Sequence, residues 1–155
     1  MRAIEQLLKD VATATEGVEH YGRGAKAYAN LDASSYPRIW VHLVNPVDTL
    51  HKNGLVTSTY EVIGEVTALC DYTADIANGQ SGTDAGEATE QYLDTMELVQ
   101  AIYLRFVTNL NKHPLNKQAI GQVTRREVVH DYDDNVTGYV FTLTMTIHEQ
   151  INYQC

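Results

Sequence analysis

The sequence predicts an α+β domain in which two helices pack on a mostly antiparallel sheet of about four strands. Two long segments alternate apolar and polar residues, as strands with one buried face do. Two other segments repeat apolar residues every three or four positions, as amphipathic helices do. In chain order the elements read α-β-β-α-β-β and form two hairpins. No composition shift divides them, so residues 1–155 are expected to be a single domain.

Each helix is predicted from an apolar stripe. Residues 3–18 carry the first stripe, at helical spacing. Residues 87–111 carry the second, which Leu93 and Ile102 widen, and His113-Pro114 ends it. A stripe of this kind is typical of a helix that packs on a core. The members of the second stripe are Tyr92, Met96, Val99, Tyr103, Phe106 and Leu110.

The first predicted hairpin joins residues 38–44 to Leu55–Asp71. Asn45-Pro46 is expected to end its first strand, and Asn53-Gly54 is a hairpin turn signal. The second strand is apolar at even positions, so one face should be buried and the other wet. A strand this long should bend or overhang its sheet, with Gly64 as a bulge site. The even apolar positions are Val56, Tyr60, Val62, Val66 and Cys70.

The second predicted hairpin joins residues 120–132 to residues 139–151 through a turn cluster at residues 133–138. Its last strand alternates most clearly, with Tyr139, Phe141, Leu143, Met145, Ile147 and Ile151 on one face. Residues 72–86 are expected to be irregular, and a loop of that length in a compact domain usually has a function.

The net charge of −9 comes from one segment. Residues 53–104 contain no Lys or Arg, and the eleven acids outside this segment are matched by the eleven basic residues. Two interpretations stay open: solvated faces with acids at helix N-termini, or a negative patch that repels DNA or recruits a cation or a basic partner. The nine acids are Glu61, Glu65, Asp71, Asp75, Asp84, Glu87, Glu90, Asp94 and Glu97, and the first seven form the candidate patch.

Patterns for catalysis, cofactors and metals are missing, so we expect a protein that is not an enzyme. The histidines show no metal spacing, although His42, His130 and His148 lie on three predicted strands and could converge. No serine lies in a nucleophile elbow. Residues 21–24 follow a helix and lack the end of a phosphate loop, and residues 131–135 depart from calcium-loop spacing.

The composition argues against several classes of protein. The apolar runs are far shorter than the roughly 20 residues that span a bilayer, so we expect no membrane partner. The negative charge argues against nucleic-acid binding through a basic face. Two cysteines give no disulfide framework and indicate a reducing compartment. Ten tyrosines beside two phenylalanines and one tryptophan fit either a tyrosine-rich core or a half-wet interface, and we favour assembly through sheet edges.

The sequence resembles the tail terminator (tail completion) proteins of tailed bacteriophages, and head–tail connector proteins look similar at this level. The resembling parts are the N-terminal helix, Tyr36–Val41, Leu55–Asp71, the helix around Tyr92–Leu110, and the final hairpin from Thr124 to Leu143. The resemblance implies a homo-oligomeric ring, usually a hexamer, that caps the tail tube and joins it to the head connector. It also implies a virion location after assembly in the host cytoplasm, without catalytic residues or cofactors.

In such a ring, the acidic segment would make a negative lumen through which DNA passes without specific binding. Two other hypotheses stay open. One is a small acidic binding module for a basic protein partner. The other is an enzyme with a metal held by His42, His130 and His148.

Overall fold

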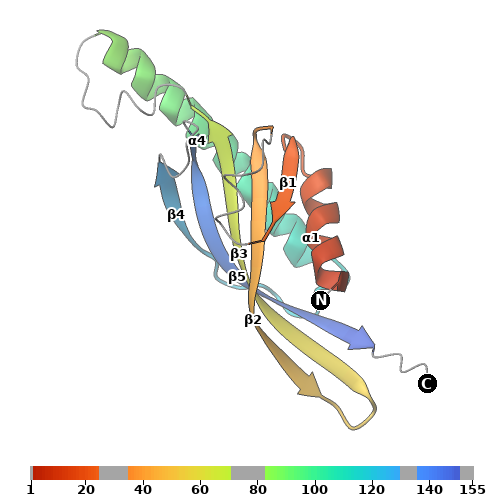
Figure 1. Ribbon diagram of the computed structural model, residues 1–155. Helices are drawn as coiled ribbons and strands as arrows, with labels where there is room; N and C mark the ends of the chain where they lie inside the picture. Colours follow the sequence, from red (N-terminus) through yellow and green to blue (C-terminus); the bar gives the residue numbers. More distant parts are fainter. Residues whose placement is uncertain (1, 25–34, 71–82, 130–135, 151–155) are drawn as a thin grey trace.

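The computed structural model describes residues 2–24, 35–70, 83–129 and 136–150. These residues form two layers (Figure 1): helices α1 (Arg2–Ala14) and α4 (Thr83–Lys112) cover one face of a five-stranded sheet. The predicted α+β class with two packed helices is therefore confirmed.

The sheet runs in the spatial order β1-β2-β3-β5-β4. Strand β1 is parallel to β2, whereas every other neighbouring pair is antiparallel, as predicted for most of the sheet. The described elements follow the order α-β-β-β-α-β-β, so the predicted order α-β-β-α-β-β was one strand short. The strand bounds are His20–Arg23, Arg38–Leu50, Leu55–Leu69, Thr124–Val129 and Val136–Gln150 for β1 to β5.

Strand β1 is the element that the sequence prediction missed. It has four residues and no apolar alternation, so its conformation depends on pairing with β2. The Glu19 amide donates to the Pro37 carbonyl at 2.9 Å, and the Gly24 amide donates to the Val41 carbonyl at 3.0 Å, at the two ends of the pairing. These bonds hold α1 and the following chain against the edge of β2.

Strand β2 continues through Asn45-Pro46, so the prediction that this dipeptide ends the strand was wrong. Val44 pairs with Glu61 and Val47 pairs with Thr59, which sets two residues of β2 against the single residue Tyr60. This is a β-bulge, one of the few places where a sheet accepts proline. Asn45 adopts a positive φ of 50° there.

The prediction of a bulge at Gly64 was wrong. Gly64 pairs in register with Val41 on one side and Phe141 on the other. The predicted alternative that this strand overhangs its sheet was also wrong, because all 15 residues of β3 pair with β5. The sheet itself extends past the helical layer at one end (Figure 1).

The core lies between the helices and the sheet, and the predicted apolar faces supply it. The helical stripes are buried as expected, except that Tyr92 is only partly buried and Leu93 is exposed. The first helix ends at Ala14, so the predicted helix 3–18 was wrong for its last four residues. Phe141 of β5 packs beside Tyr103 and Phe106 of α4, at ring-centroid distances of 5.4 and 6.0 Å. Other buried members are Ile4, Leu8, Ile39, Val62, Val66, Val99, Ile102, Leu110, Leu143, Met145 and Cys70, the last a free thiol.

The opposite face of the sheet is only partly wet. Near one end, Trp40 and Val136 form a second buried cluster with Tyr36 packed on it. Glu65 and Thr67 of β3 are buried on this same face, so the predicted wet face of β3 was wrong at these positions.

Helix α4 starts earlier than the sequence indicated. Its backbone is helical from Thr83, so the predicted irregular stretch 72–86 was wrong for its last four residues. Residues 71–82 lie outside the described part of the chain. The predicted turn cluster 133–138 was wrong for Val136–Gly138, which belong to β5.

Candidate functional site

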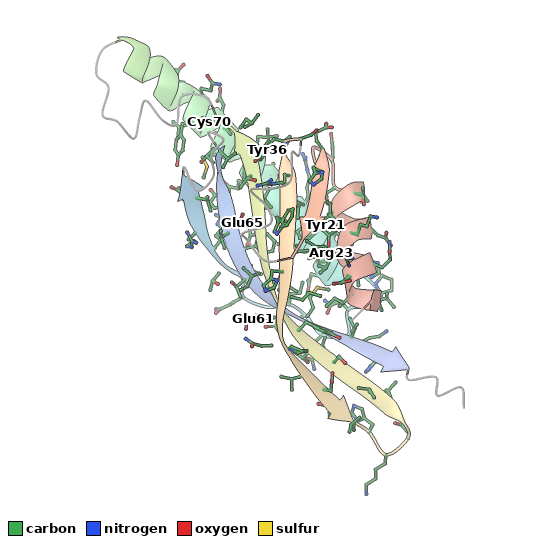
Figure 2. The ribbon with its side chains drawn as sticks, viewed as in Figure 1. Tyr21, Arg23, Tyr36, Glu61, Glu65 and Cys70 are labelled. Atoms are coloured by element: carbon green, nitrogen blue, oxygen red, sulfur yellow. The ribbon has the colours of Figure 1, made fainter. Side chains whose placement is uncertain are left out.

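A hairpin arm extends beyond the helical layer. We define it as residues 47–59, the end of β2, the turn, and the start of β3. In Figure 1 it lies at the lower end of the sheet, past both helices, with the end of β5 beside it. Figure 2 shows side chains on both faces of the arm. Residues 47–54 are exposed, whereas Val56 and Ser58 are buried on the helix-side face. The exposed side chains of the arm are available to other molecules.

The bulge decides which side chains the arm exposes. Before it, Ile39 and Val41 of β2 face the helices. Because the bulge adds one residue, the alternation reverses: Asp48 and Leu50 now pair with the helix-side residues Ser58 and Val56. Val47 and Leu50 therefore lie on opposite faces of the arm, 62% and 79% exposed. Aliphatic side chains this exposed on both faces are suited to insertion against another surface.

The turn of the arm is well formed. The His51 amide donates to the Leu55 carbonyl at 2.9 Å, and the Gly54 amide donates to the His51 carbonyl at 3.0 Å. The Asn53 side chain accepts a hydrogen bond from the Leu55 amide at 3.1 Å. Gly54 has a φ of 80°, which glycine adopts without steric cost. This confirms the predicted Asn-Gly turn and fixes His51 and Lys52 at the tip.

Cross-strand hydrogen bonds hold the arm together. The Thr57 hydroxyl lies 2.8 Å from His51 Nε2 and 3.1 Å from His148 Nδ1 of β5. The Ser58 hydroxyl donates to the Asp48 carboxylate at 2.7 Å. Thr59 and Thr146 lie 3.1 Å apart through their hydroxyls. The arm is therefore bonded to β5 as well as within its own hairpin.

The structure describes the side chains of three of the seven candidate acids. Glu61 and Glu65 lie on the face of β3 away from the helices, as labelled in Figure 2. Glu61 accepts a hydrogen bond from the Asn45 amide group at 3.0 Å, while Glu65 is buried beside Trp40. Glu90 is exposed on α4, in the other layer.

The side chains of the other four candidate acids are not described by the structure. Asp71 and Asp75 lie outside the described residues. Asp84 and Glu87 belong to the first turns of α4, where the structure describes the backbone alone. Asp94 and Glu97, the last two acids of the segment, are exposed on α4 with Glu90. The described acids are thus divided between the two layers.

His42 and His148, two of the three histidines considered for a metal site, do not come together. His42 belongs to the β2 position paired with Ile63, and His148 is paired with Thr57. Six residues of β3 separate these two positions, about 20 Å along an extended strand. His130 lies outside the described residues. Within the described ranges, no group of three or more His, Cys, Asp or Glu side chains could hold a metal ion.

A small hollow lies between α1 and β1. Its charged lining includes Glu5 and Lys9 of α1 and Arg23 of β1, and Arg23 donates to Glu5 in an ion pair. The Tyr21 hydroxyl is buried there without a hydrogen-bond partner among the described residues. Burial raises the pKa of Tyr21, Glu5 raises it further, and Arg23 opposes them. The ion pair and the tyrosine join α1 to the sheet edge.

The outer side of α4 carries a surface that sequence reasoning passed over. We call it the α4 patch: Glu90, Leu93, Asp94, Glu97 and Leu98. At about 100° per residue these five positions fall within roughly 140° of arc, opposite the buried stripe. Leu93 is 54% exposed and Leu98 45% exposed, and the three acids are exposed beside them. The signal was the apolar residues outside the stripe: the prediction counted Leu93 with the buried stripe and did not consider Leu98.

Among the helices of the described residues, none is long and apolar enough to cross a membrane. No protein-family model matches the sequence, and no curated protein matches it significantly.

Proposed function

We propose that this protein is a structural subunit of a bacteriophage tail or neck. In this proposal it acts as a tail terminator, forming a ring that caps the tail tube and joins it to the head connector. The hairpin arm carries the proposal, because it extends past the core and exposes Val47 and Leu50 on its two faces. The sequence resemblance suggests which assembly the protein joins, and the arm provides a surface through which a subunit could contact its neighbours.

The proposal assigns no chemistry to the protein. A ring subunit needs rigid contact surfaces, and the arm meets this need through its cross-strand hydrogen bonds. In the ring, DNA would pass through the lumen without specific binding. Glu61 is the described acid that best suits the lumen, since it lies on the sheet face opposite the helices and is half-exposed.

One experiment tests the proposal directly. The mass of the purified protein is measured by light scattering, alone and with the tail-tube subunits of the same phage. We expect a closed ring, or a monomer that becomes a ring on the tube end and stops tube growth. A protein that stays monomeric and leaves tube length unchanged would contradict the proposal.

A second candidate is a small acidic module that binds a basic protein one to one. The α4 patch favours it, because three exposed carboxylates lie beside exposed leucines. Such a complex would weaken steeply with salt, because opposed surface charges are screened. A one-to-one complex with a basic partner, formed by a protein that never self-associates, would favour this candidate over the ring.

A further inference from the structure

We infer that the tip of the hairpin arm docks on the α4 patch of a second copy of this chain. This rests on the proposed function, and it names the contact that would join neighbouring subunits. The tip consists of Leu50, His51 and Lys52, and the α4 patch consists of Glu90, Leu93, Asp94, Glu97 and Leu98.

Lys52 of the tip is complementary in charge to the α4 patch, and Asp48, an exposed acid of the arm, accepts a hydrogen bond from Ser58. Lys52 is the last basic residue before Arg105, and the turn holds it at the exposed tip. The α4 patch presents three exposed carboxylates and belongs to the segment without any Lys or Arg. Complementary charge favours encounter and fixes the register of a contact.

The two surfaces also match in apolar character. Leu50 is 79% exposed at the tip, and Leu93 and Leu98 are exposed on the helix. Leu50 stands near Lys52, and the two leucines of α4 stand next to the acids of the patch, which gives the apolar centre with a polar rim that protein interfaces use.

Contact within one chain is excluded by distance. Tyr92 of α4 donates to Glu127 of β4, and the Thr137 hydroxyl contacts Met96 of α4, so this part of the helix lies near Thr137. Thr137 pairs with Ala68, twelve residues along β3 from Val56 of the arm. Twelve extended residues span about 40 Å. The tip and the patch thus lie at opposite ends of the molecule, as Figure 1 shows.

Two different surfaces at opposite ends give a head-to-tail contact. Repeated from copy to copy, such a contact closes into a ring or continues as a filament. It also gives the acids of α4 a different role from Glu61: they would hold the neighbouring subunit, while the sheet face stays available to the lumen.

The test is a charge swap followed by sedimentation velocity at low salt. Lys52→Glu and the triple variant E90K/D94K/E97K are each expected to raise the Kd for self-association at least tenfold. An equimolar mixture of the two variants is expected to restore association between unlike copies to within about threefold of the original Kd. Leu50→Asp is expected to weaken association as strongly, and it changes a side chain that is 79% exposed.

Lys9→Glu is the matched control, because Lys9 is an exposed lysine on α1, outside both surfaces. Normal association of the swap variants, or a mixture that is not restored, would overturn the contact. If the original chain still forms rings in that case, the proposed function stands. A chain that remains monomeric alone and with tail-tube subunits would overturn both.

Discussion

Gly64 and Phe141 face each other across β3 and β5, and the phenylalanine ring covers the space where a side chain of residue 64 would be. A Cβ on Gly64 would lie 2.2 Å from the ring's Cζ atom. The ring cannot easily move, because Tyr103 and Phe106 of α4 pack on it. The glycine therefore makes room for the largest apolar side chain at the centre of the sheet.

Gly64→Ala is expected to lower the free energy of unfolding by about 2 kcal/mol, the usual cost of overpacking a core. Urea denaturation measures it. Phe141→Leu in the same chain should relieve the clash, so the double variant is expected to lose less than the sum of the single variants. Thr144→Ala, an exposed change on β5, is the control. Additive losses would show that the ring does not set the requirement for glycine.

Asn45→Ala is expected to destabilise the protein by about 1 kcal/mol, because alanine tolerates the left-handed region less well than asparagine. Asn45→Gly removes the same hydrogen bond to Glu61 but accepts the positive φ. Its loss in urea denaturation should therefore be smaller. Equal losses for the two variants would indicate that the hydrogen bond matters and the backbone conformation does not.

Trp40 is expected to report the packing of the sheet face opposite the helices. Its side chain is buried, and its indole N–H donates to the Gly24 carbonyl at 2.9 Å. As the single tryptophan of the chain, it should emit at short wavelength and resist quenching by iodide. Gly22→Ala would place a Cβ 2.1 Å from its ring, so this variant should shift the emission to longer wavelength. Unchanged emission would contradict the described packing.

Tyr21 should make the protein less stable at alkaline pH. Burial raises its pKa in the folded state, whereas the unfolded chain releases the proton near the ordinary value of about 10. Its contribution is therefore complete below about pH 10 and falls as the pH rises above it. Urea unfolding of the original chain and Tyr21→Phe, from about pH 9 to 11, measures the difference. The variant should lose less stability over this interval, and equal slopes would contradict the prediction.

The fold was predictable where the sequence has a period. The alternation of β5 and the stripe of α4 were both read correctly, because one continuous core buries each of them. Strand β1 was not predictable, since four residues without alternation form a strand only once β2 lies beside them. The end of β2 was misread for a related reason. A bulge reverses the alternation at Asn45-Pro46, and an asparagine followed by proline is usually a signal that a strand ends.

The candidate site was less predictable. Glu61 and Glu90 belong to the same segment of uniform charge, yet they lie in different layers of the fold. Charge along a sequence does not specify which layer a residue joins. The exposed leucines of α4 were hidden for the opposite reason: a helical wheel rich in apolar residues does not show which of them the core leaves out.

The bulge at Asn45-Pro46 determines which face of the arm each following side chain occupies. Removing one residue there would rotate every following side chain of the strand to the other face, and Val47 and Leu50 would exchange sides. Removing or adding two residues would change only the reach of the arm. In chains that share this architecture, we therefore expect the arm strands to differ in length by even numbers of residues, so that lineages adjust how far the arm extends while its inward and outward faces are preserved.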